Sequence, residues 1–185
     1  MKKITRLLSL DLEMNQPSGN IIQIGACACE IASGEVLDTF CQYITLPGDE
    51  QITPFIAGLT GISQAQVDMV GVPIAEGYQN LRNFMQKYDI HFSVVTWGGG
   101  DNVELVTQAQ AADPNAVGLG RRWIDAKTLY ISYRLAIGLD IQSGLAKSMT
   151  KMGLVFKGRK HDAVDDAVNT WTMYKTLLKL FNHPE

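Results

Sequence analysis

The chain has 185 residues, of which 46% are hydrophobic and 19% are charged. This length suits one domain of ordinary size, over residues 1–185, and the composition excludes a disordered chain because it supplies enough apolar surface for a core. The formal net charge of −3 excludes a strongly basic protein, so any site for a polyanion has to be a local patch.

Three cysteines, without the density of a disulfide framework, favour a reducing, cytoplasmic compartment. Charged residues break the first apolar run within a few positions, which is unlike a signal peptide. No later run reaches the length of a membrane span, so we expect no membrane partner.

Runs of apolar residues predict three strands, over residues 4–12, 20–31 and 35–44. Ser33 and Gly34 supply a tight turn between the second and the third, so we expect an antiparallel meander. Pro47 and Pro54 fall in the next stretch, 45–63, which predicts irregular structure with at most one short helix.

In the second half of the chain, strands and helices alternate. Pro73 can open a helix that has apolar residues at helical spacing. Two more strands are predicted, over 92–97 and 121–126, the first ended by three glycines. Further helices are predicted over residues 101–111, 126–136, 142–151 and 163–181. A meander followed by this alternation indicates the α/β class, with a mixed five-stranded sheet flanked by helices.

Two carboxylates interrupt the first predicted strand. Asp11 and Glu13 are two residues apart, so their side chains point to the same face. Like charges side by side repel, and burial raises the cost further. An edge strand or a structural salt bridge would relieve this cost, and a bound cation would do so as well.

Other acidic residues follow the predicted strands or open the last helix, together with a histidine: Asp101, Asp125, His161, Asp162, Asp165 and Asp166. Each has an ordinary explanation, because aspartate commonly caps helices and is favoured in their first turn. Together, Asp11, Glu13, Asp101 and an aspartate of the last helix would form a ligand set for Mg²⁺ or Mn²⁺, and His161 can act as a base. Two such ions and a base fit phosphodiester hydrolysis.

At this point the sequence resembles the DEDDh 3′–5′ exonucleases of the ribonuclease H-like superfamily. Their Asp-x-Glu motif matches Asp11-Leu12-Glu13, their second aspartate matches Asp101, and their His-x-x-x-x-Asp motif matches His161 to Asp166. The segment TWGGGD, residues 96–101, is similar to the Eri-type branch of this family, which acts largely on RNA.

The resemblance implies a metal-dependent 3′–5′ exonuclease that releases nucleoside 5′-monophosphates from the 3′ end of single-stranded RNA or DNA. Two Mg²⁺ or Mn²⁺ ions would be held by Asp11, Glu13, Asp101 and Asp166, and His161 would be the general base. The resemblance also raises a homodimer as a hypothesis. Two alternatives stay open: an endonuclease of ribonuclease H type, and a non-catalytic nucleic-acid-binding module.

The choice between two neighbouring aspartates depends on where the last helix begins. On an ideal helix Asp165 shares a face with His161, whereas the family spacing selects Asp166. The conflict disappears if His161 precedes the helix and Asp162 caps it. We therefore choose Asp166 as the ligand.

Candidate substrate contacts flank these motifs. Met14 would wedge against the terminal base, as an apolar residue does in the family, and Trp97 would stack on a base. Lys157, Arg159 and Lys160 form the best phosphate patch. The alternatives are packing in the core for the two apolar residues and a solvated loop for the basic ones.

Overall fold

The computed structural model describes residues 3–90, 93–120, 122–141 and 144–181. Its centre is a five-stranded sheet with the order β3-β2-β1-β4-β5. The strands are β1 (Arg6–Met14), β2 (Ile21–Glu30), β3 (Val36–Tyr43), β4 (Ser93–Thr96) and β5 (Arg122–Asp125). The first three pair antiparallel, and β4 lies parallel to both β1 and β5. The predicted meander and mixed sheet are therefore confirmed.

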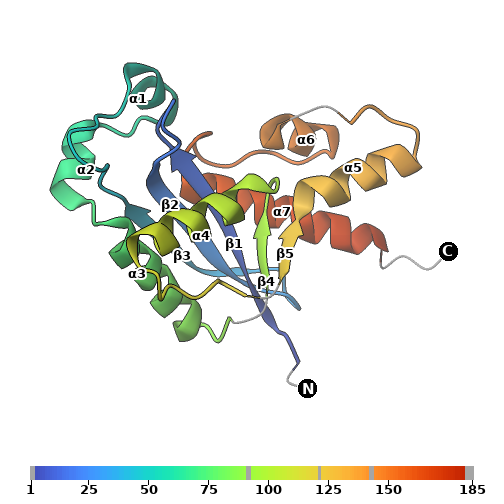
Figure 1. Cartoon of the computed structure of the whole chain (residues 1–185). Coiled ribbons are helices and arrows are strands. Elements are labelled where there is room, and N and C mark those ends of the chain that lie inside the picture. The colour runs from blue at the N-terminus through green and yellow to red at the C-terminus, as the bar shows by residue number, and fades with distance from the viewer. Residues whose placement is uncertain (1–2, 91–92, 121, 142–143, 182–185) are drawn as a thin grey trace.

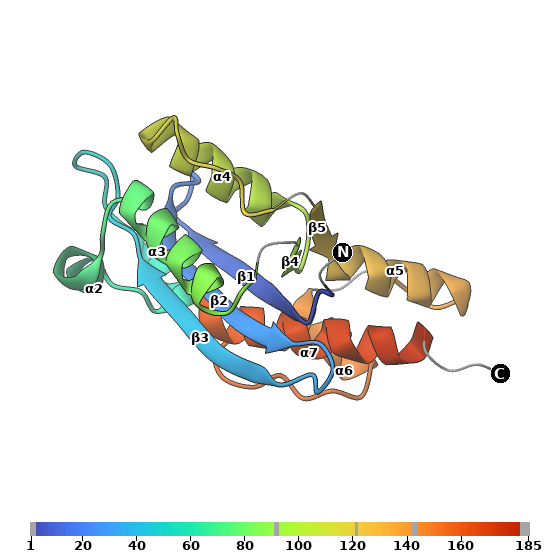
Figure 2. The same cartoon turned by 90° about the horizontal axis from the view of Figure 1, so that it is seen from below.

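Helices cover both faces of this sheet (Figures 1 and 2). One face packs on α3 and α4, and the other packs on α5 and α7, with α6 against α7. The helices are α1 (Pro54–Thr60), α2 (Gln64–Val70), α3 (Ile74–Lys87), α4 (Gly100–Ala112), α5 (Ala126–Ala136), α6 (Leu145–Lys151) and α7 (Ala163–Phe181). Among the described residues, no helix combines the length and the apolarity that crossing a bilayer requires.

The prediction is wrong about the segment before α3, where it omits α2. The hydroxyl of Ser63 caps this helix by accepting a hydrogen bond from the Gln66 N–H. Of the seven residues of α2, only Val67 is buried. A short helix with one buried residue has no apolar periodicity, so the sequence pattern gives no signal for it.

Side chains of β1 alternate between the two faces, as a strand requires. Leu8 and Leu10 pack in the core under α3 and α4. Leu7 packs on the opposite face against α7, and the hydroxyl of Ser9 donates to the Ala167 carbonyl at 2.7 Å. Asp11 and Glu13 continue this second face, so both carboxylates lie on the side that α7 covers.

The first turn of α7 approaches the sheet closely at Gly25, which pairs with Asp11 in the register of β1 and β2. A Cβ atom on Gly25 would lie 2.1 Å from the carbonyl carbon of Ala163, so only glycine fits there. The side-chain oxygen of Gln23 also accepts a hydrogen bond from the Ala163 N–H at 3.1 Å. These contacts fix the start of α7 beside Glu13.

Gly25→Ala is expected to destabilise the fold, because the added methyl group overlaps backbone atoms that cannot turn away. Overpacking of this kind costs about 1–3 kcal/mol or more. Gly118→Ala is the matched control, since a Cβ atom there meets nothing within 4 Å. Urea denaturation of both variants measures the difference. Equal midpoints would show that α7 does not depend on this close approach.

Candidate active site

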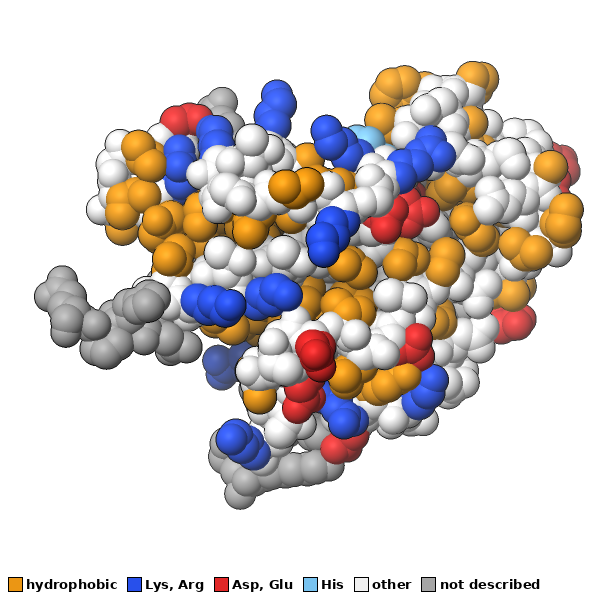
Figure 3. Space-filling model, turned by 180° about the vertical axis from the view of Figure 1, so that it is seen from behind, with side chains coloured by type: hydrophobic (Ala, Val, Ile, Leu, Met, Phe, Trp, Pro, Cys, Tyr) orange, Lys and Arg blue, Asp and Glu red, His pale blue; other side chains and the backbone are white. Residues whose placement is uncertain are grey.

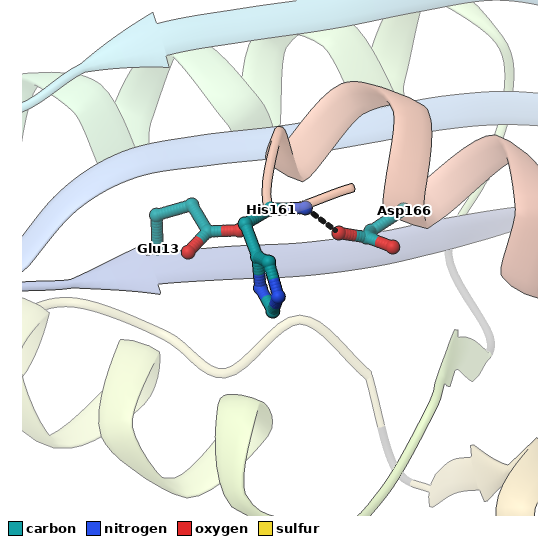
Figure 4. A group of neighbouring side chains, drawn as sticks. All are labelled: Glu13, His161 and Asp166. Atoms are coloured by element: carbon teal, nitrogen blue, oxygen red, sulfur yellow. Dashed lines mark hydrogen bonds between the residues drawn. The ribbon is translucent and has the colours of Figure 1, made fainter. Parts of the chain in front are cut away.

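Three of the five predicted catalytic residues meet at the carboxyl end of β1, and Asp11 and Asp101 lie outside this closest group. Glu13, His161 and Asp166 each offer one ligand atom, and these three atoms lie within 4.8 Å of one another. Figure 4 shows Glu13 reaching from β1 toward the loop before α7, and Asp166 in the first turn of that helix. Residues that are about 150 positions apart in the chain therefore share one small volume.

His161 lies outside α7, in a left-handed backbone conformation with φ of 61°. Its N–H donates to Oδ2 of Asp166 at 2.8 Å (Figure 4). The carboxylate of Asp162 caps the helix by accepting hydrogen bonds from the Val164 and Asp165 N–H groups. This is the arrangement in which the sequence motif selects Asp166.

Asp165 has a different partner. Its carboxylate accepts a hydrogen bond from the Arg159 N–H at 2.7 Å. It also packs against Gly158, where a Cβ atom would lie 2.3 Å from the carboxylate of Asp165. The buried side-chain amide of Asn169 accepts a hydrogen bond from the Lys157 N–H and donates one to the Lys157 carbonyl. Residues 157–161 are therefore fastened to α7 along their whole length.

The remaining acidic residue of the motif set, Asp101, lies on α4. Asp101 is the second residue of that helix, and Gly99 is its N-cap residue, without a side-chain capping bond. The capping explanation for Asp101 is therefore wrong. Asp125 is the true cap of α5, and its Oδ1 also accepts a hydrogen bond from the Gly98 N–H at 3.0 Å. Asp125 thus holds the glycine turn that precedes Asp101.

The pKa values of these carboxyl groups are raised, because the groups are crowded together and partly removed from water. Burial, followed by the charges of Asp101, Asp166 and Glu13, raises the pKa of Asp11 well above its usual range. Burial and the charge of Asp166 raise the pKa of Glu13 to about 8. Burial and the charge of Asp125 raise the pKa of Asp101 to about 6. Burial also raises the pKa of Asp166, although the His161 N–H opposes this.

Neither structural explanation for Asp11 and Glu13 applies. Their strand is the middle one of five, not an edge strand. Among the described residues, the ion pairs join other groups: Arg6 to Glu30, Lys87 to Asp38 and Lys151 to Asp140. This partly buried acidic cluster has no lysine or arginine paired with it in the described structure, and its hard oxygen donors fit a divalent metal ion of the Mg²⁺ or Mn²⁺ kind.

The two apolar substrate candidates are only half-exposed. Met14 packs against the core cluster of the α3 and α4 face. Trp97 packs on Tyr130, with ring centroids 5.7 Å apart, and joins two core clusters. The packing alternative therefore accounts for most of both side chains, and base contact through their exposed edges stays a prediction.

The three basic candidates are exposed and adjoin the histidine in sequence. Lys157, Arg159 and Lys160 flank it in sequence, and Figure 3 shows Lys and Arg side chains gathered around an exposed histidine. The guanidinium of Arg159 reaches across to Gly61, at the end of α1, where a Cβ atom would overlap it. The loop before α7 and the end of α1 therefore touch at the rim of the site.

Sequence reasoning missed a buried polar contact just after the first motif. Asn15 donates to Oε1 of Glu50 at 2.7 Å and accepts a hydrogen bond from the Thr53 N–H at 3.0 Å. Thr53 caps α1, so Asn15 ties α1 to the end of β1. Phe55, the second residue of α1, is 71% exposed. In the sequence, the only sign of this contact was Asn15, a polar residue directly after a predicted strand. Nothing in the sequence marked Glu50 as its partner.

Comparisons with known proteins agree with this geometry. Residues 8–174 match the family model of the exonucleases, described as RNase T. The chain is 25% identical over 173 residues to 3′-5′ exoribonuclease 1 of Rattus norvegicus, covering 86% of this chain and 49% of the relative. It is 31% identical over 150 residues to ERI1 exoribonuclease 3 of Homo sapiens, covering 77% and 43%. The chain thus spans about half the length of these relatives.

Solved structures share the fold. The nuclease domain of 3′hExo, a DEDDh family member bound to rAMP, superimposes with a TM-score of 0.81 at 22% identity, over 95% of this chain and 92% of that one. Cell-death related nuclease 4 gives a TM-score of 0.83 at 18% identity, over 95% and 64%. The predicted ribonuclease H-like fold is therefore confirmed.

With the fold, the acidic cluster and the matched residues in place, the chain belongs to the exonuclease family. Within that family it is a member of the DEDDh group, and its similarity to the exoribonucleases above places it in the Eri branch. The family resemblance that the sequence motifs indicated is confirmed.

Stability of the metal-free protein is expected to fall as pH rises. A carboxyl group whose pKa is higher in the folded state binds its proton more tightly there, so its contribution is lost as pH passes from the unfolded value toward the folded one. For Glu13 these values are 4.5 and about 8. The Tm in chelator should therefore be lower at about pH 8 than at about pH 6.

Added Mg²⁺ or Mn²⁺ should raise the Tm most at the higher pH, because the ionised carboxylates then gain a counter-charge. Glu13→Gln should flatten the pH dependence, whereas Glu35→Gln, which changes an exposed side chain in the β2–β3 connection, should leave it intact. Thermal unfolding with and without metal provides the measurement. A metal-free Tm that rises between these pH values would contradict the assignment.

Proposed function

We propose that the chain is a metal-dependent 3′–5′ exonuclease that hydrolyses phosphodiester bonds at the 3′ end of single-stranded RNA or DNA and releases nucleoside 5′-monophosphates. The observation that carries this proposal is the convergence of Glu13, His161 and Asp166 beside an exposed basic loop. The names of the relatives support it, although the chain spans about half of their length.

In this proposal Asp11, Glu13, Asp101 and Asp166 hold two divalent metal ions, Mg²⁺ or Mn²⁺. Such ions, when bound, supply Lewis-acid activation of water and neutralise charge that develops on the phosphate. The raised pKa values of these carboxyl groups favour this role, because each group would gain from a nearby positive charge. Asp125 and Asp162 act as positioning residues for Asp101 and α7 respectively.

His161 is the general base of the proposed reaction. Its backbone is held by Asp166, while its side chain is exposed beside the acidic cluster. A neutral imidazole nitrogen takes a proton from the attacking water as the water oxygen bonds to phosphorus. The bond from phosphorus to the 3′ oxygen breaks, this oxygen takes a proton from solvent water, and the shortened strand leaves with a 3′ hydroxyl group.

Substrate contacts would come from two sides of the site. Lys157, Arg159 and Lys160 would bind phosphate oxygens, because they are exposed and adjoin His161. The exposed edges of Met14 and Trp97 would contact the terminal base. Phe55 on α1 offers an exposed ring on which a further base would stack.

The cellular setting and assembly complete the proposal. The described structure contains three free cysteines, two of them buried, which supports a reducing, cytoplasmic compartment. The single five-stranded sheet supports the proposal of one domain over residues 1–185. A homodimer stays a hypothesis, supported by the exposed apolar side chains of Leu135 and Ile137 at the end of α5. Light scattering measures it directly, and a mass near 20.4 kDa would reject it.

A single strand labelled at its 5′ end tests the reaction type. With a free 3′ hydroxyl group, the strand should shorten by one nucleotide at a time in Mg²⁺ or Mn²⁺. With a blocked 3′ end it should stay intact, because the site is proposed to start at a 3′ terminus. Asp166→Asn should abolish cleavage, whereas Asp165→Asn should reduce it less, since Asp165 only supports the loop.

Cleavage of the blocked strand would identify an endonuclease of ribonuclease H type instead. Binding without any cleavage, under all metal conditions, would identify a non-catalytic module. Running RNA and DNA strands in parallel also determines which of the two is preferred.

His161→Ala should lower kcat by about 10²–10⁴-fold, the usual contribution of a positioned general base. The wild-type rate should fall with decreasing pH, because a protonated imidazole cannot accept a proton. The variant should keep the Tm increase caused by metal ions, since its carboxylates are unchanged. Wild-type rates with an unchanged pH profile in this variant would remove His161 from the role of base.

A further inference from the structure

Charge is distributed very unevenly along this chain. Residues 126–181 contain nine Lys and Arg residues against four Asp residues, whereas residues 1–125 contain seven Lys and Arg against fourteen Asp and Glu. The positive part forms α5, α6 and α7, the layer on one face of the sheet (Figure 2). Three of its four acidic residues belong to the active site or its supporting loop: Asp162, Asp165 and Asp166.

Along α7, one stripe faces solvent for the length of the helix. It runs from Asp165 through Thr172 to Lys175 and Lys179, at helical spacing, and its members are partly or fully exposed. The stripe begins where Asp165 binds the backbone of the basic loop 157–160, and it continues for about 20 Å. After Asp166 the helix contains no acidic residue.

The amines of this stripe are available to an anion. Lys175 is partly exposed and donates one hydrogen bond to the Gly34 carbonyl at 3.1 Å, so its ammonium group keeps two donors for other partners. Lys179 is exposed. Most solvated helix faces mix both signs of charge, but this one carries only positive charge after its first turn. Figure 3 looks onto this layer and shows Lys and Arg side chains spread over it.

We propose that this α7 stripe, continuous with the loop 157–160, binds the phosphate backbone of the part of the substrate strand that lies outside the catalytic site. The inference rests on the proposed function, because it takes the 3′ end to lie in the acidic cluster. From there a polyanion is repelled by the acidic residues of 1–125 and attracted by the α5–α7 layer. Phosphates spaced along a strand match amines spaced along a helix.

Two variants and a control test this surface. Lys175→Gln/Lys179→Gln removes both charges of the stripe, and Lys179→Gln alone leaves the Gly34 contact in place. Lys87→Gln removes the same charge from α3, on the opposite face. Binding of a single strand of about ten nucleotides is measured against salt, in an Asp166→Asn background that does not cut it. Hydrolysis of a dinucleotide is measured with metal, without that background change.

The double variant should weaken binding of the longer strand and lower the slope of log Kd against log salt by about 1.4, which is about 0.7 for each lost phosphate contact. Lys179→Gln should show about half of this decrease, and Lys87→Gln should show none. Dinucleotide hydrolysis should be unchanged in every variant, because a dinucleotide does not extend along α7.

Equal effects of the α3 and α7 variants, or no effect of either, would overturn the proposal. So would a dimer in light scattering that dissociates in the double variant while strand binding stays unchanged, because the stripe would then face the acidic half of a second copy. If the unmodified protein fails to hydrolyse the dinucleotide but its strand binding still depends on Lys175 and Lys179, the exonuclease proposal fails and the surface is retained.

Discussion

The arrangement of this protein depends on one electrostatic problem, the repulsion between carboxylates that are buried at the end of its central strand. Asp11 and Glu13 are not relieved by position, since β1 has neighbours on both sides, nor by a cationic side chain in the described structure. Additional carboxylates from α4 and α7 increase the repulsion. Such a cluster is costly for the fold alone and becomes favourable once a divalent cation is present, which ties stability to the proposed function.

Much of this site could be predicted from sequence because its informative residues break local rules. Two acids inside an apolar strand, and a histidine five residues before an aspartate, are visible without a structure. The supporting contacts could not be predicted in the same way. Asn169 looks like any polar helix residue, and its role exists only because the loop at Lys157 folds back onto it. Helix α2 escaped prediction because it buries a single residue.

Side chains at the rim of the site contact both the core and the site. Their role therefore cannot be read from the sequence alone. Trp97 stacks on Tyr130 in the interior, yet it belongs to the turn that leads to Asp101. Its indole N–H is buried, and no hydrogen-bond partner for it is found in the described part of the chain. Trp97 therefore contributes to core packing and also lies beside the site, so mutating it would change both stability and the geometry of the site.

The close packing of α7 on Gly25 and Ser9 also determines at which stage of folding the site can form. The contact from Ser9 to Ala167 joins residues 158 positions apart, so it closes a very long loop. Contacts of such sequence separation form late, after local helices and the hairpin. Glu13 and Asp166 therefore stay apart in partly folded chains, and a polypeptide that has not finished folding lacks the complete set of ligands. The proposed catalytic centre is therefore complete only in molecules that have finished folding.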